Sequence, residues 1–343
     1  MSLLPYLERV VEKHDLSPAD AHAAMHAILA GEATPAQIGA FLIALKMKGE
    51  KASELVGFAR AMREMAAPVD HGLDGETLLD TCGTGGDGSG TFNISTLAAF
   101  TVAGAGVKVA KHGNRSITSQ CGSADLLESL GIDIALPPEQ WARAIREVGI
   151  GFLFAPAMHS ATKHAQPVRR ELRMRTVFNL LGPLTNPAGA NAQLVGAPSE
   201  QAAGLMAEAL AVLELRRGFV VHGSDGLDEI TTTGPTTVFE IRDGRVEKRT
   251  LTPDDFGVRT ASPEELKGGD SACNRRIAHT VFAGDRGPCR DIVLANAAAA
   301  LVAAGQVETF LEGAAIAAVS IDSGAARAKA EQLARFTQQR SRV

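Results

Sequence analysis

The chain contains a single Trp, a single Tyr and only four Cys among its 343 residues. So few large aromatic rings argue against a protein that binds single-stranded nucleic acid, because such proteins stack bases on aromatic side chains. The 34 basic residues form no long run and the formal net charge is −5, so there is no polybasic arm or membrane-surface patch. No apolar run reaches the roughly 18 residues of a membrane span. We therefore expect neither a nucleic-acid partner nor a membrane partner.

The spacing of the four cysteines indicates neither disulfide bonds nor a metal site. Cys82, Cys121, Cys273 and Cys289 are scattered and include no C-x-x-C pair, which excludes a disulfide scaffold and a zinc knuckle. The chain begins Met-Ser-Leu-Leu-Pro, with no basic leader before an apolar run. We expect reduced thiols and a cytoplasmic protein. A hydrophobic content of 45% over this length suits two globular domains with a sizeable core.

A small helical domain is predicted for residues 1–70. Ser17 and Thr34 each provide a hydroxyl N-cap directly before a Pro, and a side chain able to complete the cap follows three residues later. A basic, mostly helical stretch over 160–187 shows no strand pattern. We expect part of it to return to the helical domain and complete it.

Residues 75–343 predict a larger α/β domain with a mainly parallel central sheet flanked by helices. Short apolar strands alternate there with helical segments, a pattern typical of parallel strands joined by helical crossovers. Asp243-Gly244 predicts a type I′ turn within a hairpin. The expected strands are 77–82, 107–110, 150–154, 193–196, 218–222, 237–241 and 246–250, and the expected helices include 95–104, 123–130 and segments of 288–338.

A glycine-rich loop follows the first expected strand and resembles a phosphate cradle. Ser95 and Thr96 then open the next helix, where unpaired amides and the helix dipole favour an anion. The loop contains neither G-x-x-x-x-G-K-[ST] nor a good dinucleotide fingerprint, and Asp87 would repel a pyrophosphate unless a ribose hydroxyl or Mg²⁺ were its partner. A turn without a ligand is the alternative. The glycines are Gly83, Gly85, Gly86 and Gly88.

Two further loops follow expected strands and add charge. Lys111 and Arg115, with hydroxyl side chains at 116–119, could hold phosphate through charge-assisted hydrogen bonds. The adjacent carboxylates of Asp228 and Glu229 suit Mg²⁺, which prefers oxygen ligands and bridges to substrate phosphates. Taken separately, these loops could be a solvated basic turn and an acidic turn. Their positions after neighbouring strands favour one phosphate and metal site.

Taken together, the motifs resemble the anthranilate phosphoribosyltransferase family, essentially from end to end. The resemblance rests on their order along the chain as well as on their residues. The matching segments are Gly83–Asp87, Thr91–Thr96, Lys111–Arg115, Gly122–Asp125, Arg175–Pro187 and Asp225–Glu229.

The resemblance implies a pentosyltransferase of tryptophan biosynthesis, acting at the second step from chorismate. Such an enzyme transfers the 5-phosphoribosyl group from phosphoribosyl pyrophosphate to the amine of anthranilate and releases pyrophosphate, with Mg²⁺ as cofactor. It also implies a homodimer joined through the small helical domain. An aromatic amine is largely unprotonated at neutral pH, so we assign no catalytic nucleophile or obligatory base.

The resemblance also implies site residues. Those for anthranilate are Gly83, Asn114, His159 and Arg169, with Arg169 facing the carboxylate, and those for the metal are Ser95, Asp228 and Glu229. Those for phosphoribosyl pyrophosphate are Gly83, Thr84, Gly85, Gly86, Asp87, Thr91, Asn93, Ser95, Thr96, Lys111 and Ser119.

One region departs from the family pattern, and two other functions compete with this one. Residues 157–162 differ from the usual family sequence and Arg173 replaces the usual Gly, both near the expected anthranilate entrance. A pyrimidine nucleoside phosphorylase has a similar architecture, but it has no need for the Asp228-Glu229 pair. A non-catalytic, nucleic-acid-binding paralogue should be basic and should have lost parts of the loops.

Overall fold

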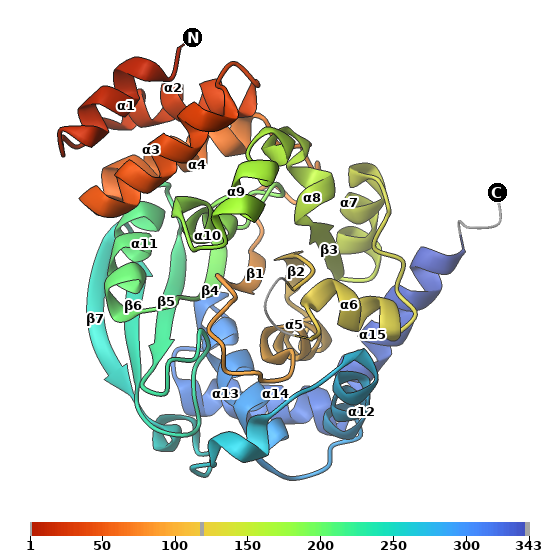
Figure 1. The fold of residues 1–343 in the computed structure, drawn as a ribbon. Helices are drawn as coiled ribbons and strands as arrows, with labels where there is room; N and C mark the ends of the chain where they lie inside the picture. Colours follow the sequence, from red (N-terminus) through yellow and green to blue (C-terminus); the bar gives the residue numbers. More distant parts are fainter. Residues whose placement is uncertain (1, 117–119, 340–343) are drawn as a thin grey trace.

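The computed structural model describes residues 2–116 and 120–339. In Figure 1 the helices of the N-terminal segment lie together at one side of a twisted sheet, and the other helices surround the sheet. None of the helices in the described ranges combines the length and apolarity needed to cross a bilayer.

Four helices form the N-terminal bundle, and two of them begin as expected. Ser17 accepts a hydrogen bond from the Asp20 amide, and Thr34 and Gln37 form a reciprocal capping box. Each cap satisfies amides that the first helical turn leaves unpaired. The helices are α1 (Leu4–Val11), α2 (Pro18–Leu29), α3 (Pro35–Lys48) and α4 (Ala52–Glu64).

The central sheet has seven strands in the order β3-β2-β1-β4-β5-β6-β7. The first five in this order are parallel, and β6 and β7 are antiparallel, which confirms the predicted fold class. Asp243 and Gly244 have φ of 51° and 75°, as a type I′ turn requires. The strands are β1 (Leu78–Gly83), β2 (Lys108–Gly113), β3 (Ile150–Phe154), β4 (Ala192–Gly196), β5 (Arg217–Gly223), β6 (Thr236–Arg242) and β7 (Arg245–Leu251).

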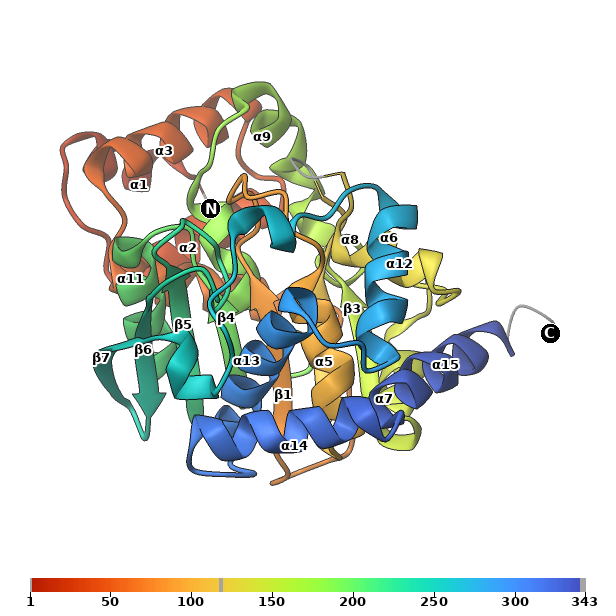
Figure 2. The ribbon, with the colours of Figure 1, turned by 90° about the horizontal axis from the view of Figure 1, so that it is seen from below.

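Helices cover both faces of the sheet, and Figure 2 shows α13 and α14 with α5 on one of them. Helices α7, α11 and α12 were not among the expected elements. The remaining helices are α5 (Ile94–Gly104), α6 (Ser123–Ser129), α7 (Pro138–Glu147), α8 (Ala155–Met158), α9 (Gln166–Leu172), α10 (Val177–Leu181), α11 (Glu200–Val212), α12 (Ser271–Phe282), α13 (Pro288–Ala303), α14 (Phe310–Asp322) and α15 (Ala325–Gln338).

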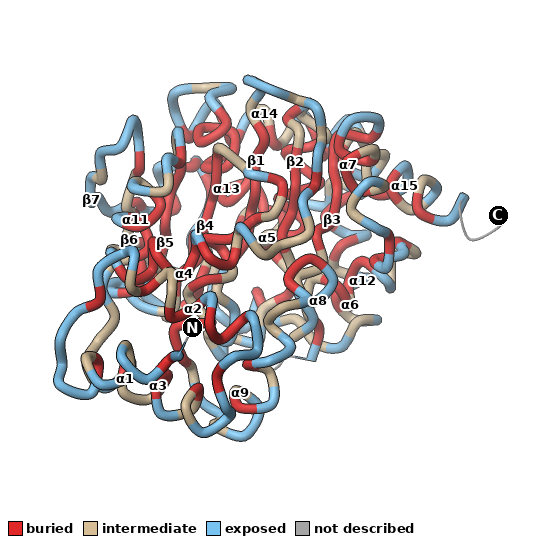
Figure 3. Tube along the Cα trace, turned by 90° about the horizontal axis from the view of Figure 1, so that it is seen from above, coloured by how far each residue is buried: buried red, intermediate tan, exposed pale blue. Residues whose placement is uncertain are grey.

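Two apolar cores lie on opposite faces of the sheet, and the strands contribute alternate residues to them. Phe219 and Val221 of β5 pack into the core with α5 and α13, whereas Val220 packs into the core that contains α11 and the N-terminal helices. This alternation is the period of two of a strand. Figure 3 shows the parallel strands as largely buried segments, whereas the edge strand β7 is mostly exposed. Apolar packing therefore covers both faces of the sheet.

The segment after β3 runs back over the N-terminal bundle. Its 3₁₀ turn Ser160–His164 contacts α2, α9 contacts α3, and α10 contacts α3 and α4. Arg173 ends α9 with φ 48° and ψ 34°, in the left-handed region that favours glycine. The family resemblance implies Gly at this position. Arg173 therefore places a side chain in a left-handed backbone conformation, which costs about 1 kcal/mol for a residue other than glycine.

A buried ion pair joins α3 to α4. Lys48 Nζ lies 3.0 Å from Glu54 Oε1, and the two side chains are 3% and 0% exposed. The Glu54 carboxylate also accepts hydrogen bonds from the Leu16 and Lys51 amides, both at 2.9 Å. Loss of the lysine would leave a buried carboxylate without its counter-charge.

We expect Lys48→Met to lower the free energy of unfolding by about 3 kcal/mol, the cost of leaving one member of a buried pair alone. Urea titration followed by circular dichroism measures this change. Lys46→Met, at an exposed position of the same helix, is the control and should change stability little. Equal stability of the two variants would contradict the prediction.

Candidate active site

Two loops and the end of β2 meet at the carboxyl edge of the sheet, as parallel strands require. Lys111 was expected in the loop after 107–110, but it lies within β2, which extends to Gly113. The loop after β1 donates the Gly85 amide to Asp228 Oδ2 at 2.7 Å. The Ser95 amide, in the first turn of α5, donates to Glu229 Oε1 at 3.1 Å. Lys111 Nζ, from β2, lies 3.3 Å from Ser95 Oγ. The structure thus brings the predicted glycine loop, lysine and acidic pair together.

Glycine is required where the acidic segment crosses the strand ends. A Cβ at Gly196 would lie 1.5 Å from the Asp228 carbonyl oxygen, and one at Gly83 would lie 2.6 Å from Asp228 Oδ2. Within the loop, Gly85 and Gly86 have φ of 66° and 70°. The Gly85 amide donates to the Asp228 carboxylate, so one amide of this loop already faces a carboxylate oxygen.

In the acidic pair, Asp228 is buried and Glu229 is half-buried, and little neutralising charge lies beside either carboxylate. Burial raises the pKa of Asp228 to about 7, with the charge of Asp87 as a further cause, and burial with the charge of Asp228 raises the pKa of Glu229 to about 8. A cation between them would remove this penalty. No ready-made cluster of three His, Cys, Asp or Glu side chains for a metal occurs within 2–116 and 120–339. The donor set suits Mg²⁺, which keeps waters and uses substrate phosphates as further ligands.

Lys111 is the buried cation of the site. Its Nζ donates to the Thr81 carbonyl oxygen as well as to Ser95 Oγ. Burial lowers the pKa of this amine, against the opposing charges of Asp80 and Glu229. Burial also raises the pKa of the Cys82 thiol well above its ordinary value, so this neighbour is not an activated nucleophile.

The remaining residues expected to bind phosphoribosyl pyrophosphate differ in what their side chains do. Asp87 accepts hydrogen bonds from the amide and hydroxyl of Ser89, and Thr84 donates its amide to the Gly196 carbonyl oxygen. Thr91 forms an isolated bridge with Lys267. Ser119 lies outside the described residues.

Asn93 and Thr96 face inward. The Asn93 amide group donates to the Cys121 carbonyl oxygen at 3.1 Å and accepts from Asn274 Nδ2 at 2.9 Å. Thr96 Oγ1 is buried and has no hydrogen-bond partner in the structure. The side-chain atoms of Asn93 are therefore already paired inside the protein.

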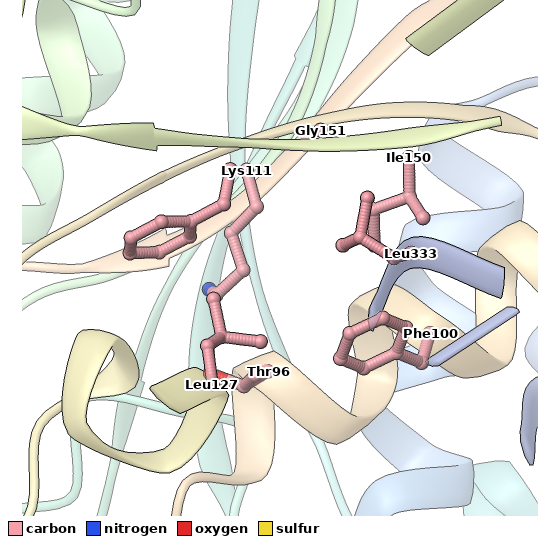
Figure 4. A pocket seen from close by; sticks show the side chains of 8 residues that line it. Thr96, Phe100, Lys111, Leu127, Ile150, Gly151 and Leu333 are labelled. Atoms are coloured by element: carbon pink, nitrogen blue, oxygen red, sulfur yellow. The ribbon is translucent and has the colours of Figure 1, made fainter. Parts of the chain in front are cut away.

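Thr96 and Lys111 also border a small cavity on the inner side of the site. Figure 4 shows their side chains together with Phe100 and Leu333 around this space. The other lining residues are Leu127, Ile150, Gly151 and Phe152. The lining is almost wholly apolar, so this space is a packing gap behind the site and not a phosphate site.

Arg175 contacts the glycine loop, a role that the sequence did not reveal. Its guanidinium donates to the Gly86 carbonyl oxygen at 2.7 Å and to Thr84 Oγ1 at 3.1 Å. It reaches the loop from the segment that packs on the N-terminal helices. Arg175 opens the segment Arg175–Pro187 that matches the family, but neither that match nor the basic run over 160–187 assigned it a contact with the loop.

Of the residues expected to bind anthranilate, Arg169 lies on this segment and His159 directly before it, whereas Asn114 follows β2. Asn114 is exposed after β2, and its Oδ1 accepts the Arg115 amide at 2.8 Å. The Arg115 guanidinium turns away to Asp125 and Glu128, both at 2.7 Å, and not to the glycine loop. Arg169 lies over the Phe178 ring at 5.0 Å. Within the described part of the chain, no carboxylate forms an ion pair with Arg169.

His159 packs against His112 deep in the structure, with ring centroids 5.1 Å apart. His112 Nδ1 lies 3.0 Å from the Gly182 carbonyl oxygen, which only accepts, so the proton is on Nδ1. Nε2 of each ring is buried without a hydrogen-bond partner in the structure. Burial is the main cause that lowers the pKa of His112 to about 3 and that of His159 to about 4, so both rings are neutral at neutral pH.

Comparison with known families defines the class of protein. A sequence model of the glycosyl transferase family, a/b domain, matches residues 75–327, and one of the helical bundle domain of that family matches residues 4–66. The two matches together span most of the chain. The chain therefore has the two domains of a glycosyl transferase of this family, an α/β domain and a helical bundle domain.

Individual relatives narrow this class. Anthranilate phosphoribosyltransferase of Solibacter usitatus (strain Ellin6076) is 72% identical over 340 residues, which cover 99% of this chain and 100% of that protein. The solved structure of the enzyme from Thermus thermophilus aligns with a TM-score of 0.92 at 44% identity, covering 97% of this chain and 99% of that one.

The Saccharomyces cerevisiae enzyme, solved in complex with PRPP and Mg, aligns with a TM-score of 0.90 at 30% identity over 98% of both chains. Another structure of that yeast enzyme, in complex with 4-fluoroanthranilate, aligns with a TM-score of 0.88. The chain belongs to the anthranilate phosphoribosyltransferase family.

The buried histidines predict a loss of stability in acid. The unfolded chain protonates histidine below a pKa of about 6.5, whereas folded His112 stays neutral down to about 3. The free energy of unfolding should therefore fall as pH decreases from about 6.5, by about 2 kcal/mol for His112 at pH 5.

Urea titrations at pH 7.5 and pH 5.0 test this effect. His112→Gln should reduce the difference between the two pH values, and His279→Gln, at an exposed site, should not. An undiminished difference in His112→Gln would refute the assignment.

Proposed function

We propose that this protein transfers the 5-phosphoribosyl group from phosphoribosyl pyrophosphate to the amine of anthranilate, the second step from chorismate in tryptophan biosynthesis. The observation that carries the proposal is the meeting of the glycine loop, Lys111 and the Asp228-Glu229 pair at one sheet edge. Loop amides and a buried cation suit a pyrophosphate, and adjacent carboxylates suit its metal. The relatives' names and bound ligands support the same substrates.

Phosphoribosyl pyrophosphate is assigned to the glycine-loop side of the site. Gly83–Asp87 would line the phosphates, with the Gly86 and Asp87 amides as the proposed donors, because the Thr84 and Gly85 amides already donate to the Gly196 carbonyl oxygen and to Asp228. Ser95 and Thr96 would place the positive end of α5 beside the phosphates. Lys111 would add a full positive charge. Thr91, Asn93 and Ser119 complete the proposed set, and the internal pairing of the Asn93 side chain favours contact through its backbone.

Anthranilate is assigned to the space toward the 160–187 segment. Arg169 would bind the carboxylate, because the structure records no carboxylate partner for it among the residues described. Asn114, His159 and Gly83 would border the ring and its amine. A neutral His159 fits an uncharged aromatic ring better than a protonated one would.

Mg²⁺ is the proposed cofactor, held by Asp228 and Glu229 with the Ser95 hydroxyl. The fit rests on two neighbouring carboxylates whose pKa values are raised by desolvation and by a nearby negative charge, that of Asp87 for Asp228 and that of Asp228 for Glu229. Asp228 accepts the Gly85 amide of the glycine loop, and Glu229 accepts the Ser95 amide at the start of α5. When bound, the ion would neutralise charge on the pyrophosphate oxygens.

The reaction breaks the bond from the ribose C1 to a pyrophosphate oxygen, and the bonding electrons leave with pyrophosphate. The anthranilate nitrogen forms the new bond to C1 and loses one proton to solvent. Lys111 and the loop amides would stabilise the departing charge. Positioning two substrates side by side contributes up to roughly 7–11 kcal/mol in favourable cases, so no strong base is required.

A homodimer joined through the small helical domain is part of the proposal. Three large apolar side chains on α1 and α3 are exposed in the single chain, Leu4, Val11 and Met47 at 45%, 63% and 79%. Contact with a second copy would remove this apolar surface from water.

The decay of anthranilate fluorescence tests the proposed reaction. Protein mixed with anthranilate, phosphoribosyl pyrophosphate and Mg²⁺ should consume anthranilate, and chelation of the metal should stop it. Asp228→Asn with Glu229→Gln should abolish Mg²⁺-dependent turnover and retain the fold, checked by circular dichroism. Unchanged activity would refute the metal role. Activity with a nucleoside and free phosphate in place of these substrates would instead favour a nucleoside phosphorylase.

Arg169→Ala should raise the KM for anthranilate by about tenfold or more, because a hydrogen bond to a charged group contributes about 1.5–3 kcal/mol. The KM for phosphoribosyl pyrophosphate should stay within about twofold. Arg170→Ala, at an exposed position on the same helix, is the matched control. Equal effects on the two KM values would contradict the placement of Arg169.

A further inference from the structure

Asn296 is a fully buried amide in the middle of α13, and all of its side-chain hydrogen bonds go to backbone. Its Oδ1 accepts the Ile230 amide at 3.0 Å, and its Nδ2 donates to the Ile230 carbonyl oxygen at 2.9 Å. The same Nδ2 donates to the Ile292 carbonyl oxygen, also at 2.9 Å. One side chain thus holds both backbone groups of one residue.

That residue directly follows the proposed metal pair. Residues 224–235 form no helix or strand, so no ladder fixes the backbone of Asp228 and Glu229. On one side the segment lies against Gly196 and Gly83, where no side chain would fit. The clamp from Asn296 at Ile230 holds the segment immediately after the pair.

Electrostatic repulsion is the reason why the backbone beside the acidic pair must be held in place. Asp228 is buried, Glu229 is half-buried, and their charges repel. Each carboxylate reaches a different partner, the Gly85 amide for Asp228 and the Ser95 amide for Glu229. A backbone free to shift would let the carboxylates move apart or turn away from these partners. Outer residues that orient metal ligands commonly change metal affinity by 10–100-fold.

We propose that Asn296 is a positioning residue for the Asp228-Glu229 pair and sets the affinity of the site for Mg²⁺ without touching the ion. The inference rests on the proposed metal role of the pair. Asn296 fits this role because an amide offers a donor and an acceptor side by side, as a backbone amide and carbonyl require. A purely apolar residue in this Ala-rich helix would pack and would leave Ile230 unpaired.

Two substitutions of Asn296 remove its hydrogen bonds to Ile230. Asn296→Ala removes all three hydrogen bonds. Asn296→Ser is the milder change, because a helical serine can still donate to the carbonyl oxygen four residues earlier, Ile292, and loses only the bonds to Ile230. Both should act in the same direction, so the serine variant serves if the alanine variant does not fold.

Asn191 provides a matched control elsewhere in the sheet. Its Oδ1 accepts the Leu78 amide at 3.0 Å and its Nδ2 donates to the Glu76 carbonyl oxygen at 2.8 Å. This is a comparable amide clamp, but it lies at the start of β1, the opposite end from the site. Asn191→Ala should therefore lower the melting temperature with little effect on the metal.

The experiment measures Mn²⁺ binding to each full-length protein by electron paramagnetic resonance, with pyrophosphate present, and the Mg²⁺ dependence of turnover. The Asn296 variants should bind Mn²⁺ about tenfold more weakly. Their kcat should recover at saturating Mg²⁺, and their KM for anthranilate should stay within about twofold. Asn191→Ala should keep the wild-type Mn²⁺ affinity.

The outcomes distinguish this inference from the proposed function beneath it. Wild-type Mn²⁺ affinity in a folded Asn296 variant would overturn the positioning role alone. Equal weakening in Asn191→Ala would also overturn it, since general loss of stability would then explain the effect. The variant with Asp228→Asn and Glu229→Gln tests the metal assignment itself. If it binds Mn²⁺ as tightly as the wild-type protein does, the metal assignment and the inference are both overturned.

Discussion

The close approach of Asp228 to Gly196 is the contact on which the site depends. A Cβ at Gly196 would overlap the Asp228 carbonyl oxygen, so only glycine lets the chain after β5 cross the end of β4. That crossing brings Asp228 to the loop after β1 and Glu229 to the first turn of α5. A loop, a helix and an acidic turn from distant parts of the sequence therefore form one site.

Charge is the second constraint, because the site brings together a buried carboxylate, a half-buried carboxylate and a buried ammonium. Desolvation raises the pKa of both carboxylates, and the charge of Asp87 adds to the effect on Asp228 as the charge of Asp228 does on Glu229. Lys111 and two backbone amides offset only part of this cost. The arrangement is most favourable with a cation and an anionic ligand present, which is the combination that a metal–pyrophosphate substrate provides.

Strand β2 contributes to both sides of the proposed site, because its successive side chains point to opposite faces of the sheet. Lys111 reaches Ser95 on the glycine-loop side, whereas His112 reaches the Gly182 carbonyl oxygen and the His159 ring. The same segment that carries Gly182 also carries Arg175, which binds the glycine loop. This segment therefore contacts the N-terminal helices through α10 and the glycine loop through Arg175.

The sequence by itself determined the helices begun by Ser17 and Thr34, the parallel strands, the hairpin at Asp243 and the loops that carry the charged residues. These follow from local spacing, since caps, turns and strand alternation involve residues close in sequence. Only the tertiary structure decided that Arg115 turns to Asp125 and Glu128, that Arg175 reaches the glycine loop and that Asn296 clamps Ile230. The direction of a long side chain and the partner of a buried amide depend on packing between residues far apart in sequence, which local spacing does not encode.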